Sequence, residues 1–106
     1  MGRLINISPY AYPGISIDHV SVMQRVCSIY KDITPDMLMD HTHKRKIVEP
    51  RQLCIYLMRK DLKLTLQDIQ QKFNFKTHAA VMHSIEAVEK LLATNKEYRN
   101  KTKSLI

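Results

Sequence analysis

The fold is decided by the stretch TLQDIQQKFNFKTHAAVMH, residues 65–83, which contains the signals for two helix starts and one helix end. Thr65 and Asp68 have the spacing of a capping box, which predicts a helix over residues 65–73. Asn74 follows at once, and asparagine tolerates the left-handed conformation that ends many helices. The stretch therefore predicts a short helix followed by a tight turn.

Thr77 predicts the start of a second helix, because its hydroxyl can accept from free backbone amides of the first turn. That helix is expected over 77–94 and to end near Asn95. Two helices joined by a tight turn have the layout of a helix-turn-helix, and on layout alone an ordinary helical hairpin is the alternative. The apolar stripe of the second helix consists of Val81, Ile85, Val88, Leu91 and Leu92.

Apolar spacing predicts three further helices upstream. Residues 17–30 form the first, after a cap at Ser16, and Thr34-Pro35-Asp36 starts a short helix through Met39. A basic connector over 40–49 is then followed by a central helix that Pro50 begins and Leu62 ends. Six consecutive apolar residues in it, 53–58, indicate burial on several sides, although a buried strand competes. The stripe expected on the first helix is Ile17, Val20, Met23, Val26, Cys27 and Tyr30.

We therefore expect an all-α domain over residues 16–106, a small helical bundle containing a helix-turn-helix, preceded by an extended arm over 1–15. Tyr98 and Leu105 are expected to dock the basic tail. No apolar run is long enough to cross a bilayer, and residues 1–14 do not resemble a secretion signal. The two cysteines form no CxxC motif, which fits buried thiols in a reducing cytoplasm.

The charge is concentrated in one part of the chain. The net charge is +7, with three basic and four acidic residues in 1–40, but fourteen basic and six acidic residues in 41–106. A surface so polarised attracts polyanions, which favours nucleic acid as the partner. The second helix of the motif opens with Lys76, Thr77 and His78, whose position favours phosphates, while Ala79 and Ala80 allow close approach to bases.

Catalytic and metal sites are not indicated. His78 and His83 are five residues apart, not the four that would place both on one helix face for chelation. No nucleophile lies in a recognisable arrangement with a base. Only two glycines are present, and GxxxxGK[ST] does not occur. We expect no enzyme activity, no cofactor, no metal and no nucleotide.

The segment IVEPRQLCIYLMRKDLKLTLQDIQQKFNFKTHAAVMHSIEAVEKL, residues 47–91, resembles the C-terminal DNA-binding domain of the chromosomal replication initiator DnaA. That domain is a helix-turn-helix related in fold to the Trp repressor. Pro50-Arg51-Gln52 is similar to the family's PRQ, and Thr65-Leu66-x-x-Ile69 to its S-L-x-x-I-G. Residues 73–83 are similar to its F-G-x-R-D-H-[ST]-T-V-x-H signature. The similarity extends over roughly residues 17–100.

The resemblance implies double-stranded DNA as the partner and assigns roles to individual positions. It implies a base contact for His78 and places Thr77, Ala79 and Ala80 at the bases. It also implies contacts with the DNA backbone for Lys44, Arg45, Lys46, Arg51, Gln52, Lys76 and His83.

This chain departs from the family where bases are read. Thr77 replaces the signature Asp, alanines replace both Ser/Thr positions, and His43 stands where the minor-groove arginine is expected. The chain thereby lacks one carboxylate acceptor and two hydroxyls, and each good base contact contributes about 1–3 kcal/mol of discrimination.

Two readings of the function follow. The first is a DNA-binding protein that acts in replication initiation, its regulation or transcription. The second is a helical interaction module that kept the fold, lost sequence-specific DNA recognition and binds a protein partner or an acidic surface. The family's ATP-binding module would precede this domain, whereas about sixteen residues do so here, which leaves a stand-alone protein or a fragment.

Overall fold

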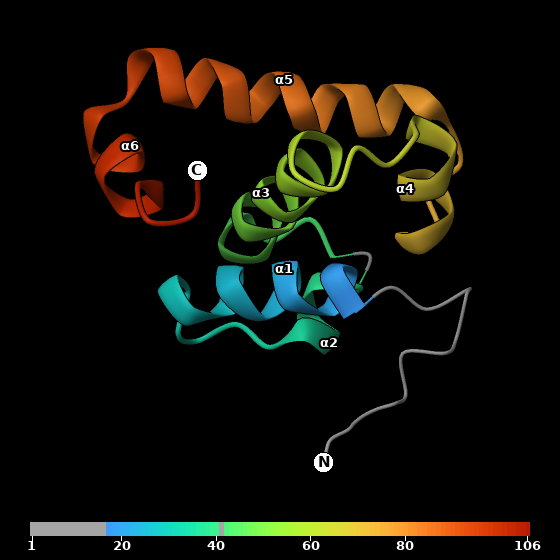
Figure 1. The fold of residues 1–106 in the computed structure, drawn as a ribbon, viewed down its shortest axis with the longest axis horizontal. Coiled ribbons are helices and arrows are strands. Elements are labelled where there is room, and N and C mark those ends of the chain that lie inside the picture. The colour runs from blue at the N-terminus through green and yellow to red at the C-terminus, as the bar shows by residue number, and fades with distance from the viewer. Residues whose placement is uncertain (1–16, 41) are drawn as a thin grey trace.

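The computed structural model describes residues 17–40 and 42–106, and within them it has six α-helices and no strand (Figure 1). The all-α prediction is confirmed. The predicted arm over 1–15 and the cap at Ser16 lie outside the described residues. The helices are α1 (Ile17–Ile29), α2 (Pro35–Leu38), α3 (Arg45–Lys60), α4 (Leu66–Lys72), α5 (His78–Thr94) and α6 (Lys96–Thr102).

The central helix α3 lies between α5 on one side and α1 with α2 on the other (Figure 1). All six apolar residues of Leu53–Met58 are buried, which confirms the central helix and rules out the strand alternative. The helices α4 and α6 lie at opposite ends of α5 (Figure 1). The long helix α5 is therefore supported along its length, with the predicted turn at one end and the C-terminal segment at the other.

The helix α1 has the predicted extent, and most of the predicted stripe faces the core: Met23 and Val26 are buried, and Cys27 and Tyr30 pack against the core. Val22 is fully buried, whereas Val20 is 43% exposed, so the expectation that Val20 faces the core is wrong. Residues 22, 23, 26 and 29 share one face at spacings of one, three and four, and residue 20 lies outside that apolar stripe. Val22 and Val26 thereby pack toward the central helix, which is the main partner of α1.

The start of α3 differs from the prediction. The helix begins at Arg45 rather than at Pro50, which lies inside it, so part of the expected connector is helical. Proline lacks the amide that would bond four residues back, and its ring crowds the carbonyl there. The first turn still forms, because Ile47 is buried and the Ile47 and Val48 amides donate to the Lys44 carbonyl. Lys44, Arg45 and Lys46 therefore lie at a helix start and not in a loop.

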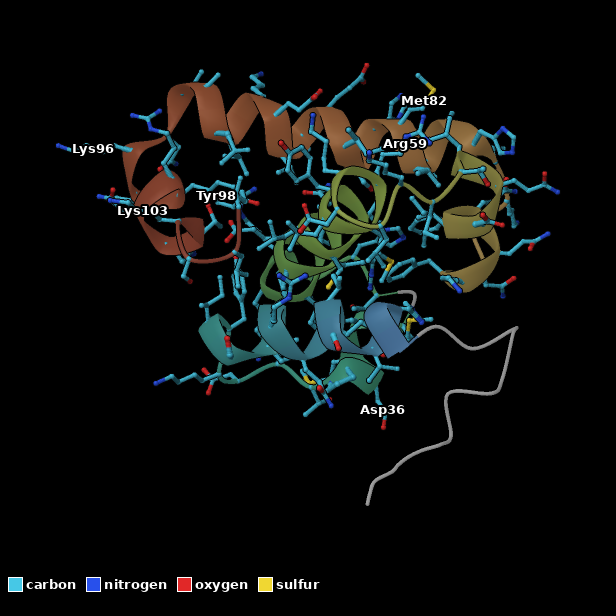
Figure 2. The ribbon with its side chains drawn as sticks, in the orientation of Figure 1. Asp36, Arg59, Met82, Lys96, Tyr98 and Lys103 are labelled. Atoms are coloured by element: carbon cyan, nitrogen blue, oxygen red, sulfur yellow. The ribbon has the colours of Figure 1, made fainter. Side chains whose placement is uncertain are left out.

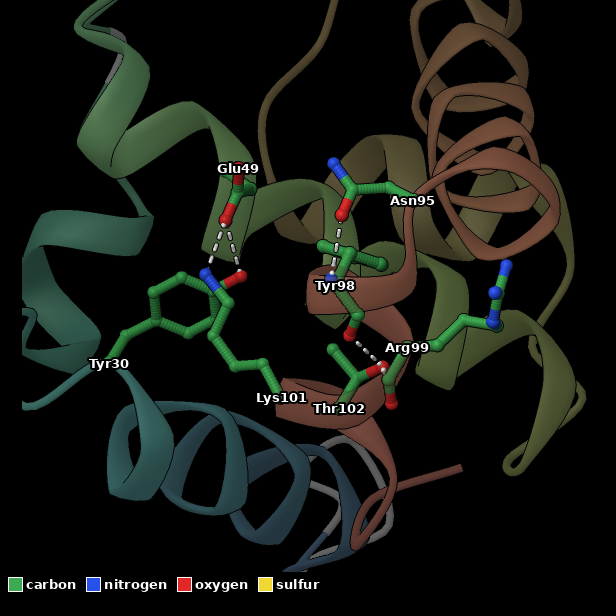
Figure 3. Close-up of polar contacts among 7 residues, drawn as sticks. All are labelled: Tyr30, Glu49, Asn95, Tyr98, Arg99, Lys101 and Thr102. Carbon is green, nitrogen blue, oxygen red and sulfur yellow. Dashed lines mark hydrogen bonds and ion pairs between the residues drawn. The ribbon is translucent and has the colours of Figure 1, made fainter.

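The tail forms a helix that sequence patterning did not predict. Asn95 caps α6 by accepting from the Tyr98 amide at 2.9 Å, and the expected docking of Tyr98 and Leu105 is confirmed by their burial. Lys101 Nζ donates to Glu49 Oε2 at 3.1 Å, and Tyr30 Oη donates to the same oxygen at 2.7 Å (Figure 3). These contacts join α6 and α3 to the residue that follows α1.

Candidate nucleic-acid interface

The turn between α4 and α5 is fixed by local hydrogen bonds. Thr65 Oγ1 accepts from the Asp68 amide at 3.0 Å, and Asp68 Oδ2 accepts from the Thr65 amide at 3.4 Å, so the predicted capping box is confirmed. Asn74 adopts a φ of 54°, as predicted for the helix end. Gln70 Nε2 then donates to the Phe75 carbonyl at 3.1 Å. The direction in which α5 leaves the turn is therefore determined by residues 65–75.

The start of α5 is exposed and capped by Thr77, whose Oγ1 accepts from the Ala80 amide at 3.4 Å. Lys76, Thr77, His78 and Ala79 are exposed, Ala80 is half-buried, and His83 is exposed one turn later. The first amides of a helix have no partner within the helix, and its dipole is positive at this end. The structure thus presents the predicted base-facing residues on the surface at an end that favours an anion.

Arg51 is the exception among the predicted contact residues. Its side chain is buried, with the residue 8% exposed. Its Nε donates to the Leu38 carbonyl at 2.9 Å, one terminal nitrogen donates to the Thr42 carbonyl at 3.1 Å, and the other to the Asp40 carbonyl. The guanidinium therefore holds the segment between α2 and α3 in place, and the geometry does not present it to a phosphate.

Arg45, at the start of α3, lies beside the second half of α5. Arg45 and Gln52 line a hollow together with Ala87, Lys90 and Thr94. Lys90 is twelve residues beyond His78, which is about 18 Å along a helix axis. Arg45 and Gln52 therefore lie beside the second half of α5 and not beside its first turn.

One face of α5 nevertheless connects the two groups. Residues 80, 83, 87, 90 and 94 repeat at spacings of three and four, and residue 79 lies four before residue 83, so they lie along a single edge of the helix. The predicted tip begins this edge, and the hollow beside α3 continues it. Sequence reasoning missed Lys90 because helical spacing alone does not say where another helix crosses.

The opposite edge of α5 carries a second hollow with different chemistry. Arg59 and Lys60 of α3 line it together with Glu86 and Glu89 of α5, and Met82 stands at its margin with 46% of its surface exposed. Arg59 and Met82 line the same hollow, and both are labelled close to α5 in Figure 2. Met82 is exposed because it falls off the apolar stripe of Val81, Ile85 and Val88.

The two free cysteines, Cys27 and Cys54, are partly and fully buried, respectively. Burial raises the pKa of the Cys54 thiol well above its usual range, and burial also raises that of Cys27. In residues 17–40 and 42–106, no three histidine, cysteine or acidic side chains gather as metal ligands would. None of the helices in these ranges has the length and apolar character needed to cross a membrane.

The chain was compared with known proteins. The family model described as the bacterial dnaA protein helix-turn-helix matches residues 20–88, which include all of α4 and most of α5. No solved structure matches.

Several similar proteins are chromosomal replication initiator proteins DnaA. That of Flavobacterium psychrophilum is 31% identical over 80% of this chain and 17% of its own length. That of Thermomicrobium roseum is 32% identical over 74% and 17%, and that of Rickettsia canadensis is 34% identical over 80% and 18%. The chain thus spans less than a fifth of each of these relatives. With the family model covering most of the chain, this protein belongs to the bacterial DnaA helix-turn-helix family.

Proposed function

We propose that this protein binds double-stranded DNA through the exposed start of α5. The observation that carries the proposal is the capped and solvent-exposed first turn of α5, whose direction the preceding turn fixes. The second helix of such a motif enters the major groove with its first residues facing base edges. Family membership and the basic charge of residues 41–106 support the same conclusion.

The proposal divides the exposed residues into two groups. Thr77, His78, Ala79 and Ala80 face bases, because they occupy the exposed first turn. Thr77 Oγ1 already accepts from the Ala80 amide, but its hydroxyl hydrogen is still able to donate to an acceptor on a base or phosphate. The residues that hold the DNA backbone in this proposal are Lys44, Arg45, Lys46, Gln52, Lys76 and His83.

We exclude Arg51 from the backbone contacts and give it a positioning role. Its three hydrogen bonds fix the chain just before Lys44, so the basic helix start depends on a side chain that does not itself touch DNA. This assignment departs from the role that the resemblance implies, and it makes Arg51 a stability residue.

The cellular role we propose is replication initiation, its regulation, or transcription, carried out in the cytoplasm. The first two follow from the relatives, each of which is named a chromosomal replication initiator protein. The activity we propose for these 106 residues is DNA binding. Nucleotide hydrolysis is not proposed, since the sequence has no phosphate-binding loop motif.

The test is a comparison of two variants by fluorescence anisotropy, using preferred duplexes selected from a random pool and random duplexes. Lys76→Ala should weaken binding to all duplexes about equally and reduce the slope of log K against log salt by about 0.9. His78→Ala should instead reduce the difference in binding affinity between preferred and random duplexes. If the two variants behave alike, or if the unaltered protein does not bind duplex saturably, the proposal fails.

A second candidate function has one observation in its favour. Met82 is exposed beside the hollow that contains Arg59, Lys60, Glu86 and Glu89, and exposed methionines suit protein partners. On this reading the domain is a helical interaction module. Met82→Ser should then abolish capture of a partner in a pull-down while duplex binding is absent or unchanged.

A further inference from the structure

Where α3 crosses α5, a hollow lies along each edge of α5, and the two hollows differ in the charges of the side chains that line them. On one edge the basic side chains Arg59 and Lys60 are matched by two glutamates. On the other edge Arg45, Gln52 and Lys90 line a hollow of about 390 Å³ in which Glu49 is the only acidic residue. Only the second hollow therefore has an excess of positive charge and amide donors.

The charge of Glu49 is already compensated within the protein. Its Oε2 accepts from Tyr30 Oη at 2.7 Å and from Lys101 Nζ at 3.1 Å. Burial by itself would raise the pKa of the Glu49 carboxyl, but these two hydrogen bonds and the nearby cations outweigh it and lower that pKa. Arg45 and Lys90 are both exposed, so their charges remain directed to solvent.

The neighbouring polar groups define which side chains can act as donors. Thr94 also lines the hollow, but its hydroxyl donates to the Lys90 carbonyl at 2.7 Å, so its hydrogen is engaged. Three donor groups remain: a guanidinium and an amide from α3 and an ammonium from α5. A guanidinium and an ammonium together with an amide suit the oxygens of a phosphate.

We propose that this hollow, lined by Arg45, Gln52 and Lys90, holds a backbone phosphate of the bound duplex about 18 Å beyond the tip of α5. The inference rests on the proposed function and adds Lys90, which neither the signature nor the basic helix start includes. It requires α5 to lie lengthwise along the DNA, because an end-on approach would hold Lys90 away from the duplex.

The test measures duplex binding over a range of salt concentrations for Lys90→Gln, with Lys60→Gln as the matched control. Both are exposed lysines on helices, and Lys60 lines the hollow on the opposite edge of α5. Lys90→Gln should weaken binding about fivefold and reduce the salt slope by about 0.9, whereas Lys60→Gln should leave the slope nearly unchanged. Lys90→Arg keeps the positive charge and should therefore retain both the affinity and the salt slope of the unaltered protein. A purely structural role for Lys90 would not require that result.

A double-mutant cycle identifies a shared phosphate. If Arg45 and Lys90 hold the same group, the loss in Arg45→Gln/Lys90→Gln should be smaller than the two single losses combined. Equal behaviour of Lys90→Gln and Lys60→Gln overturns the inference, while the weakening by Lys76→Ala would still support duplex binding. Failure of the unaltered protein to bind duplex overturns the proposed function as well.

Discussion

Replacing Arg51 with methionine separates a structural role from a role in DNA binding. The variant keeps most of the apolar stem but removes the three hydrogen bonds to the carbonyls of Leu38, Asp40 and Thr42. If Arg51 positions the chain, stability falls and the number of phosphate contacts does not. If Arg51 contacts phosphate, as the resemblance alone implies, the number of phosphate contacts falls and stability does not.

The size of the effect follows from the number and burial of these bonds. A hydrogen bond from a charged donor contributes about 1.5–3 kcal/mol when buried. One of the three bonds is buried and two are half-buried, so we expect a loss of about 3–4 kcal/mol in the free energy of unfolding. For a domain of this size that lowers Tm by about 12–30 °C.

The assay is urea denaturation followed by circular dichroism, with Arg59→Met as the control. Arg59 donates a single exposed hydrogen bond to the Leu64 carbonyl, so its loss should cost less than about 1 kcal/mol. Duplex binding is then measured well below both transition temperatures. Arg51→Met with unaltered stability and a salt slope reduced by about 0.9 would refute the reasoning.

Three further predictions concern stability and are checked by the same denaturation assay. Thr77→Ala removes the cap of α5 and should lower the free energy of unfolding by about 1 kcal/mol. Thr77→Ser keeps a capping hydroxyl and should retain most of that stability. Asn74→Gly should be neutral or stabilising at its φ of 54°, whereas Asn74→Ala should cost about 1 kcal/mol; equal values would contradict the turn assignment. The folded pKa of Glu49 is lowered by Tyr30 and Lys101 despite burial, so its contribution is present above the unfolded value of about 4.3 and is lost as pH falls through the folded value. Glu49→Gln should therefore be less stable at neutral pH and show a weaker loss of stability on acidification.

The predictable parts of the fold were those with local chemical signals. Thr34, Thr65 and Thr77 each cap the helix that follows, and Asn74 adopts the left-handed conformation its position suggested. In each case, one side chain and a few neighbouring amides determine the outcome. Such interactions are contained in a short segment and can therefore be recognised in the sequence.

The parts that were not predicted depend on tertiary packing. The helix start at Arg45 has no side-chain cap and relies on the burial of Ile47, and α6 relies on Tyr98 reaching the core. The same holds for the site. The start of α5 at Thr77 could be located from its capping residue, but the position of Arg45 relative to that start follows from the crossing of α3 and α5, which no short motif specifies.

The contact among Tyr30, Glu49 and Lys101 implies that the autonomous folding unit is longer than the segment by which the family is recognised. The family match ends at residue 88, whereas α6 begins at Lys96 and covers the core with Tyr98. A fragment trimmed to the matched residues would expose to water the apolar side chains that Tyr98 covers and would remove the ion pair between Glu49 and Lys101. Such a fragment should aggregate or melt early even though its recognition motif is complete.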